Sequence, residues 1–394
     1  MSKINTEMSA LMQTYNRFPL TLTKGKGSYV WDEEGASYLD FTSGIAVCNL
    51  GHVPEEVKHA VSEQLEQLWH CSNLFHIPAQ EKAARLLCGN DFDEAFFCNS
   101  GAEANEAAWK LARKYMYDQN KKEKTDIISF THSFHGRTGG AMAATAQEKV
   151  HTGFTPLMPG FSYLPFNEET VTEKINPEKT AAVMLELIQG EGGVRAADKS
   201  WVNNLAEFCS KNDILLIIDE IQTGAGRTGT LFAYEQYSIK PDILTAAKGI
   251  GSGFPAGAML APKNIAASFN HGTHGTTFGG NPLSMTAVYA TISAILEPGF
   301  LEDVKNKGMY FQKELQNAAA GYEVEIRGSG LMTGMAFKET IVPLIDHLRK
   351  NGVLALPAGP DVLRILPPLT ASYMELSAFA DTLKQSLNEW KEGE

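Results

Sequence analysis

The sequence lacks the features expected of a membrane protein, a secreted protein or a nucleic-acid-binding protein. No apolar stretch approaches the roughly 20 residues that a transmembrane helix needs. The polar start at residues 1–6 contains no signal-peptide apolar region. Basic residues are the minority, with 34 Lys and Arg against 46 Asp and Glu, and the resulting net charge of −12 argues against a surface that binds nucleic acid.

The cysteines are also few and show no pattern of pairing. There are five in 394 residues, an odd number, and none has the paired spacing of a zinc site. Free thiols in a reducing cytoplasm explain them better than disulfides, and we predict no metal site. Cys98 lies near the candidate site described below, but its apolar neighbours indicate a packing role.

What the sequence contains is typical of a soluble globular protein with about two domains, since 43% of its residues are hydrophobic and 20% are charged. Short apolar runs alternate with helical patterns at residues 102–117 and 282–296. This alternation predicts an α/β fold with a mostly parallel sheet covered by helices on both faces. The predicted strands are at residues 95–98, 127–130, 181–187, 214–219, 243–247 and 256–261.

The character of the chain changes after Pro298-Gly299. Two strand-like stretches, a short strand and three helices follow, and the last helix has a stripe of apolar residues at helical spacing. We predict a large domain at residues 51–298 and a smaller α+β domain at residues 299–394. Residues 1–50 contain strand patterns and are expected to pack with the smaller domain.

Two residues at strand ends give the first indication of function. Leu215–Ile218 predicts a buried strand that ends in Asp219, and a second apolar segment leads to Lys248 and several glycines. Ligands in open α/β sheets bind at the carboxyl ends of the strands. A carboxylate and an amine meeting there suit pyridoxal phosphate, whose aldehyde forms a Schiff base with an amine and whose ring nitrogen needs an anionic partner. The alternatives are an exposed lysine on a glycine-rich turn and an aspartate that caps a helix.

A third indication is the turn from a strand into a helix at Ser100, Gly101 and Ala102. A helix N-terminus offers free N–H groups and a partial positive charge, so a phosphate fits there. The alternative is an ordinary serine N-cap, with Glu103 completing a capping box. A hydroxyl from the segment at residues 276–282 could complete a phosphate site.

Six motifs in order along nearly the whole chain resemble the class III, or ω-amino-acid, aminotransferases of PLP fold type I. That resemblance implies a seven-stranded sheet in the large domain. One departure is at Gly51-His52-Val53-Pro54, because the class commonly has a His-Pro pair shortly after the Gly-His. The six motifs are Asn99–Glu106, Phe134–Thr138, Gln189–Gly193, Asp219–Gly224, Ala247–Gly249 and Thr277–Pro282.

The resemblance implies roles for the residues that bind the cofactor. Lys248 forms the Schiff base and then acts as general base and acid, and Asp219 faces the pyridine nitrogen. Positioned proton transfer of this kind contributes about 10²- to 10⁴-fold in rate. Because the charge of Asp219 is costly at the end of a buried strand, we expect a cationic partner for it. The remaining implied contacts are the phosphate with Ser100, Gly101 and Ala102, the ring faces with Phe134 and Ile221, and the ring oxygen O3′ with Gln222.

Thr277 is implied to reach the phosphate of the other subunit, which makes the protein a homodimer with its active site at the interface. For the substrate, the resemblance implies that Arg137 binds the α-carboxylate of N-acetylornithine with Thr276 as an accessory contact. Arg364 would bind the α-carboxylate of glutamate. We hypothesise that Glu191 pairs with Arg364 in the first half-reaction and moves away when 2-oxoglutarate brings its own carboxylate. The alternatives are a surface arginine and an exposed glutamate in a glycine turn.

The segments at residues 44–52 and 274–277 favour, within the class, a cytoplasmic enzyme of arginine biosynthesis. It would transfer the ω-amino group of N-acetylornithine to 2-oxoglutarate in a ping-pong reaction that gives N-acetylglutamate semialdehyde and glutamate. Ornithine, succinylornithine and 4-aminobutyrate are alternative donors. Two other classes stay open. A nucleotide-binding module is weakened by the absence of a Gly-x-x-x-x-Gly-Lys-Ser/Thr motif, and a cofactor-binding regulatory protein without turnover is the other.

Overall fold

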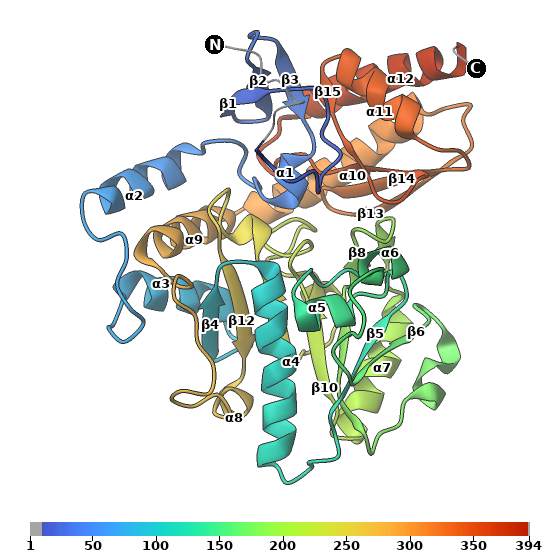
Figure 1. Ribbon diagram of the computed structural model, residues 1–394. Coiled ribbons are helices and arrows are strands. Elements are labelled where there is room, and N and C mark those ends of the chain that lie inside the picture. The colour runs from blue at the N-terminus through green and yellow to red at the C-terminus, as the bar shows by residue number, and fades with distance from the viewer. Residues whose placement is uncertain (1–9, 393–394) are drawn as a thin grey trace.

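The computed structural model describes residues 10–392, so the polar start at residues 1–6 lies outside the described part. The chain forms a large lower part built on one sheet and a smaller upper part in which the N-terminal and C-terminal segments meet (Figure 1). Within residues 10–392, no helix combines the length and apolar character that crossing a membrane requires.

The large part is organised around a seven-stranded sheet in the order β4-β12-β11-β10-β7-β5-β6. Only β12 runs antiparallel to its neighbours, so the predicted α/β fold with a mostly parallel seven-stranded sheet is confirmed. The strands are β4 (Glu94–Cys98), β5 (Asp126–Phe130), β6 (Phe161–Leu164), β7 (Thr180–Leu185), β10 (Leu215–Asp219), β11 (Ile243–Ala246) and β12 (Gly257–Ala261).

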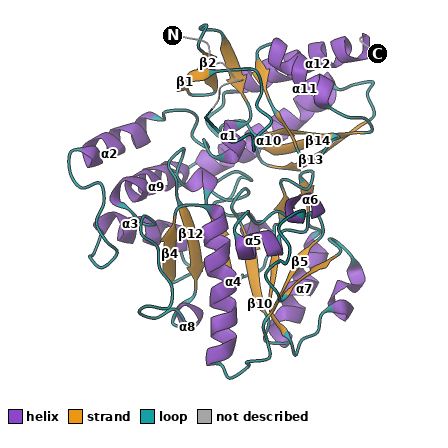
Figure 2. Ribbon diagram, viewed as in Figure 1, coloured by secondary structure: helices purple, strands orange, loops and turns teal. Residues whose placement is uncertain are grey.

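Both faces of this sheet are buried, which explains the unbroken apolar runs of its central strands. In β10, Leu215 and Ile217 pack on the face covered by α4 (Gly101–Asp118), whereas Leu216 and Ile218 pack on the opposite face. That opposite face is covered by helices that include α3 (Pro78–Cys88), α7 (Lys199–Lys211) and α9 (Pro282–Ile295). Figure 2 shows the helices around the sheet, with α2 (Glu55–Leu65) extending from it. The short helices of this part are α5 (Gly139–Ala144), α6 (Glu148–His151) and α8 (Lys263–Ala266).

Over residues 10–392, the smaller part contains two four-stranded sheets and three helices. One sheet has the order β13-β14-β17-β16 and the other β1-β2-β3-β15. The helices are α10 (Phe300–Ala318), α11 (Val342–Lys350) and α12 (Tyr373–Glu392). The strands are β1 (Leu22–Lys26), β2 (Tyr29–Asp32), β3 (Ser37–Asp40), β13 (Val324–Ser329), β14 (Met332–Phe337), β15 (Val353–Leu354), β16 (Leu356–Pro357) and β17 (Val362–Ile365).

The N-terminal strands lie against the C-terminal segment. Strand β3 pairs in parallel with β15, and the Phe41 ring stacks on the Phe379 ring with centroids 4.9 Å apart. The short helix α1 (Ser43–Ala46) then leads toward the large part, and His52 Nε2 lies 2.8 Å from Asp40 Oδ2. The domain boundaries at residues 50 and 298 stay predictions.

One strand of the large sheet and a short hairpin were not predicted from the sequence. Strand β6 has four residues of which none is fully buried, because it lies at the sheet edge, and so it has no apolar run. The hairpin joins β8 (Ile188–Gln189) to β9 (Arg195–Ala196), and its strands are too short to show a period. The loop between them contains Glu191.

Candidate active site

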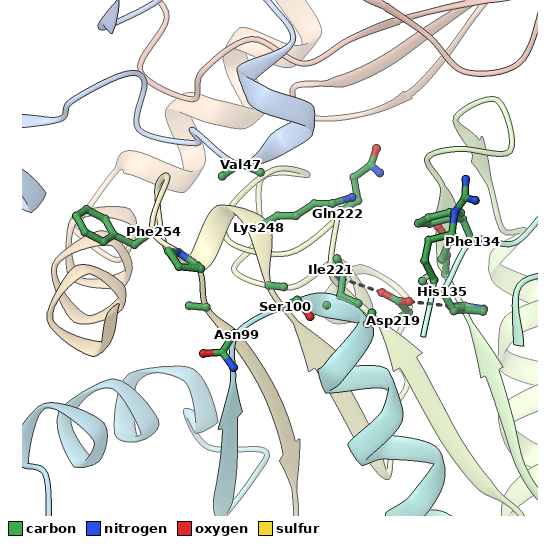
Figure 3. A pocket seen from close by; sticks show the side chains of 18 of the residues that line it. Val47, Asn99, Ser100, Phe134, His135, Asp219, Ile221, Gln222, Lys248 and Phe254 are labelled. Atoms are coloured by element: carbon green, nitrogen blue, oxygen red, sulfur yellow. Dashed lines mark hydrogen bonds and ion pairs between the residues drawn. The ribbon is translucent and has the colours of Figure 1, made fainter. Parts of the chain in front are cut away.

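A cavity of about 450 Å³ opens at the carboxyl ends of the large sheet, a volume suited to a small molecule. Strands β4, β10 and β11 each lead directly into residues that line it: Ser100, Asp219 and Lys248. Because β4, β10 and β11 are parallel to one another, their carboxyl ends meet at one edge. Figure 3 shows Lys248, Asp219, Ser100 and Phe134 around this cavity.

Lys248 follows β11 and begins a single 3₁₀ turn, Lys248–Ile250. Its backbone φ is +48°, a left-handed conformation that residues other than glycine adopt mainly where the surrounding structure imposes it. Burial lowers the pKa of Lys248, and the charge of Arg364 acts in the same direction, against Glu191 and Asp219. A lowered pKa favours the neutral amine, which is the form that attacks an aldehyde.

Asp219 ends β10 and is held by three hydrogen bonds. Its Oδ2 accepts from Asn105 Nδ2 at 2.8 Å and lies 2.7 Å from His135 Nδ1, while Oδ1 accepts from the Ile221 N–H at 3.0 Å. Burial alone would lower the pKa of His135, but the hydrogen bond to Asp219 and its charge outweigh burial and raise it. The raised pKa of His135 favours the cationic partner expected for Asp219, and the three hydrogen bonds fix the orientation of the carboxylate.

Sequence reasoning gave no role to His135 or Asn105. Asn105 is fully buried on the apolar face of α4, among alanines. A polar residue on such a face is the sequence signal that could have identified Asn105 as a site residue. Its Oδ1 accepts from Thr245 Oγ1 at 2.7 Å, so α4, β10 and β11 are joined beneath the cavity. Nε2 of His135 has no hydrogen-bond partner within residues 10–392.

Glu186 is a second buried carboxylate that sequence reasoning missed. It directly follows β7 and lines the cavity, and its Oε2 accepts from the Phe134 N–H at 2.9 Å. Burial raises the pKa of Glu186 to about 7, with Asp219 acting in the same direction and His135 and Lys248 against it. A charged residue that ends an apolar run was the available signal, as it was for Asp219.

The start of α4 combines a helix cap with the cavity wall. Ser100 is the N-cap, and its Oγ accepts from the Glu103 N–H at 3.2 Å. Glu103 in turn accepts from the Asn99 N–H at 2.7 Å and not from the N–H of Ser100, so the serine N-cap considered as an alternative is present, but without the reciprocal bond of a capping box. Ser100, Gly101 and Ala102 nevertheless all line the cavity, and the first N–H groups of a helix have no partner within it. A cap and an anion site can therefore coexist here.

Phe134 and Ile221 both line the cavity. A Cβ on Gly101 would lie 2.8 Å from Ile221 Cδ1, so only glycine lets α4 approach Ile221 this closely. Arg137 is exposed at the cavity rim, and its guanidinium carbon lies 5.7 Å from the centre of the Phe134 ring. An arginine at the rim can bind a carboxylate at the entrance.

Glu191 and Arg364 form an ion pair that joins the β8–β9 loop to strand β17. The Arg364 side chain is 2% exposed and that of Glu191 29%, so the glutamate is the more accessible member. Burial opposes ionisation of Glu191, but the charge and hydrogen bond of Arg364 outweigh it and lower its pKa. Arg364 Nη1 also donates to Gln222 Oε1 at 3.1 Å, and Gln222 lines the cavity. The pairing that the glutamate hypothesis requires is present; its opening stays a prediction.

The structure does not bring Thr276 and Thr277 into this cavity within one chain. They line a second hollow of about 810 Å³ together with His70, Leu74 and His274. Thr276 Oγ1 accepts from Asn99 Nδ2 at 3.5 Å, whereas Thr277 is exposed. The predicted roles of both threonines stay predictions.

The sequence of this chain is similar to those of known aminotransferases. Residues 10–387 match the family model described as aminotransferase class-III. An acetylornithine aminotransferase of Oceanobacillus iheyensis is 56% identical over 392 residues, covering 98% of this chain and 97% of the relative.

Two solved structures are also similar. The N-acetylornithine aminotransferase of Stenotrophomonas maltophilia has a TM-score of 0.84 at 35% identity and covers 96% of this chain and 98% of its own. An ornithine aminotransferase of Toxoplasma gondii, with partial occupancy of PLP at its active site, has a TM-score of 0.92 at 30% identity and covers 98% of this chain and 93% of its own.

Proposed function

The chain belongs to the class-III aminotransferases, and on that premise we propose that it transfers the ω-amino group of N2-acetyl-L-ornithine to 2-oxoglutarate. The products are N-acetyl-L-glutamate 5-semialdehyde and L-glutamate. The observation that carries this proposal is the meeting of Lys248 and Asp219 in one cavity at the start of α4. The 56% identity to an acetylornithine aminotransferase over almost the whole chain supports the choice of donor.

The cofactor is pyridoxal 5′-phosphate, which when bound supplies an aldehyde and a ring that accepts the electrons released at the substrate carbon. The residues fit this group at both ends. The Lys248 amine has a lowered pKa and Asp219 is held in place by His135 and Asn105. The N-terminus of α4 lies at the same cavity and suits a phosphate.

Each residue then has a distinct task. Lys248 would hold the cofactor aldehyde and, as a neutral amine, would move the proton of the substrate carbon that bears the reacting amino group. Asp219 keeps a proton on the ring nitrogen. Phe134 and Ile221 flank the ring, and Gln222 donates a hydrogen bond to its phenolic oxygen.

Arginines orient the two substrates. Arg137, with Thr276, binds the α-carboxylate of N-acetylornithine, so that the δ-amine points into the cavity. Arg364 binds the α-carboxylate of glutamate after Glu191 has moved away. A guanidinium pairs with a carboxylate through two parallel hydrogen bonds, which fixes orientation as well as charge.

The active form is a homodimer in which the partner's Thr277 completes the phosphate site. Thr277 is exposed and outside its own chain's cavity, and large apolar side chains near it are also exposed, which supports an interface there. These side chains are Leu68, Trp69, Leu74, Phe75 and Phe278, with exposures of 48%, 61%, 89%, 67% and 61%.

The enzyme acts in the cytoplasm, where it catalyses a step of arginine biosynthesis. All five cysteines are free, which suits a reducing compartment.

A donor panel tests the proposal. Purified protein loaded with pyridoxal 5′-phosphate is mixed with N-acetylornithine, N-succinylornithine, ornithine or 4-aminobutyrate in single half-reactions, and the loss of the visible cofactor band is followed. We expect the kcat/KM for N-acetylornithine to exceed that for ornithine and 4-aminobutyrate by about tenfold or more, roughly 1.4 kcal/mol of discrimination. A higher value for another donor would contradict the substrate assignment, and no bleaching by any donor would contradict the reaction.

A further inference from the structure

Gln222 stands between the cofactor cavity and the Glu191–Arg364 ion pair. It lies three residues after the end of β10, lines the cavity and is 6% exposed. Its Oε1 accepts a hydrogen bond from Arg364 Nη1 at 3.1 Å, and hydrogen bonding by the Gln222 side chain is among the causes that lower the pKa of Glu191. The Gln222 amide therefore interacts with both members of the ion pair and also lines the cofactor cavity. Glu191 and Arg364 do not themselves line that cavity.

The partners of Gln222 fix the orientation of its amide. A guanidinium can only donate, so the atom that faces Arg364 must be the oxygen. An ionised carboxylate can only accept, so the atom that faces Glu191 must be the nitrogen. While the ion pair is closed, the second N–H of the amide is left for the cavity, and Gln222 presents a donor there.

The backbone of the neighbouring turn lies close to the Gln222 amide. A Cβ on Gly190 would lie 2.2 Å from Gln222 Oε1 and 2.6 Å from its Nε2. The amide thus fits against a glycine backbone on one side and the ion pair on the other. A movement of Glu191 removes one of these contacts.

We propose that Gln222 is a positioning residue that transmits the state of the Glu191–Arg364 ion pair to the cofactor cavity. With the pair closed, the amide is held as a donor to the phenolic oxygen of the cofactor. When Glu191 leaves, Nε2 loses its acceptor and the amide is free to turn with Arg364 toward an incoming carboxylate. The inference rests on the proposed function, since it requires the cofactor in this cavity and Glu191 as the member that moves.

Direct electrostatic effects have to be separated from this transmission. The groups that act on Lys248 include Glu191, Arg364, Asp219 and Glu186. Glu191 therefore influences the lysine through space even without Gln222. A double-mutant cycle separates the two effects. The through-space effect of Glu191 persists when Gln222 is replaced, whereas an effect transmitted by Gln222 is lost.

The experiment uses holoenzyme loaded with pyridoxal 5′-phosphate and measures the pH midpoint of its visible absorption band. Four proteins are compared: the unchanged chain, Glu191→Gln, Gln222→Leu and the double variant. Removing a donor to the phenolic oxygen destabilises its anion, so Gln222→Leu alone should raise the midpoint. We expect Glu191→Gln to shift the midpoint by at least about 0.5 pH unit when Gln222 is present, and by less than half as much in the Gln222→Leu background.

Two further variants serve as a control and as an independent test of the amide position. Gln189→Leu removes a buried amide from the adjacent β8 strand, whose Nε2 donates to the Thr131 carbonyl and not to the ion pair. It should leave the Glu191→Gln shift intact. Gly190→Ala keeps every polar group but displaces the amide, and should shift the midpoint in the same direction as Gln222→Leu.

The outcomes separate the inference from the proposed function. Equal shifts with and without Gln222 would overturn the transmission, while a normal visible band would leave the aminotransferase assignment standing. A protein that develops no visible band with pyridoxal 5′-phosphate would overturn both. If Gln189→Leu abolishes the shift as well, the effect is a general loss of packing and the inference fails.

Discussion

Two charged clusters border the same cavity and differ in how they are held. Asp219, His135 and Asn105 all come from the large part of the fold, and Asp219 and His135 are nearly or completely buried. Glu191 and Arg364 come from a hairpin loop and from β17 of the smaller part, and Glu191 is partly exposed. The first cluster is built into the end of a rigid sheet, whereas the second joins two parts of the molecule through one accessible carboxylate.

This difference corresponds to two tasks. A group that keeps a proton on a cofactor has to be in place throughout the reaction, and extra hydrogen bonds preorganise it. A group that must admit two substrates in opposite orientations has to be displaceable. The predictions below test this contrast between a fixed and a movable cluster, beginning with the lysine that faces both.

Replacing Lys248 by Ala should have the largest effect. In the proposed mechanism it removes both the amine that holds the cofactor and the group that moves the proton, so turnover with N-acetylornithine should fall by at least about 10³-fold. Steady-state kcat with saturating pyridoxal 5′-phosphate measures this. Lys240→Ala, at an exposed lysine shortly before β11, is the matched control and should retain full activity. Full turnover of the Lys248 variant would disprove the mechanism.

Asp219→Asn should reduce kcat/KM by about 10²- to 10³-fold, the scale observed when one preorganised electrostatic group is removed. The amide keeps the size of the side chain but cannot hold the proton on the ring nitrogen, and it leaves buried His135 without an anionic partner. Kinetics of both half-reactions should fall alike, because the fixed cluster serves both. Asp242→Asn is the control, since that carboxylate accepts from the Leu216 N–H at the other end of the sheet. A loss confined to one half-reaction would show that Asp219 is not a shared element.

Glu191→Gln should have a smaller and asymmetric effect. Without the ion pair, Arg364 is free to attract the α-carboxylate of N-acetylornithine, so the ratio of the two half-reaction rates should change by about tenfold, roughly 1.4 kcal/mol. Stopped-flow traces with N-acetylornithine and with glutamate measure this ratio. Glu325→Gln breaks a comparable ion pair with Arg327 on the surface and should leave the ratio unchanged. Equal slowing of both half-reactions would refute the movable role.

Glu186→Gln should have the smallest effect on turnover, because its expected effect is on stability and not on substrate choice. Burial raises the pKa of Glu186 to about 7 from its ordinary value of 4.5. The folded state therefore holds this proton more tightly than the unfolded chain, and stability falls as pH rises from about 4.5 through 7. Relative to the unchanged chain, the variant should gain roughly 2 to 3 kcal/mol in free energy of unfolding between pH 5 and pH 8. Denaturant titrations at both pH values measure this, and a difference that does not vary with pH would argue against a buried proton.

The sequence predicted the parts of the fold that carry a strong period. The runs that became β5, β7, β10 and β11 and the helices α4 and α9 were identified to within two residues. Strand β6 was missed because an edge strand needs no continuous apolar run. The seven-strand count came from the resemblance to the family and not from the periodicity.

The residues of the candidate site also differ in whether a local sequence pattern could identify them. Asp219 and Lys248 follow apolar strands and could be identified from the sequence. The contact of Arg364 with Gln222 joins residues 142 positions apart, and no local pattern encodes it. Asn105 and Glu186 had local signals, a polar residue on a buried helix face and a carboxylate at the end of a strand, which were not weighed.

The most direct test of the central claim is to identify the residue that holds the cofactor. Protein loaded with pyridoxal 5′-phosphate is treated with borohydride, digested and analysed by mass spectrometry. The account predicts loss of the visible band and a cofactor adduct on the peptide that contains Lys248. No adduct, or an adduct on a different lysine, would contradict it.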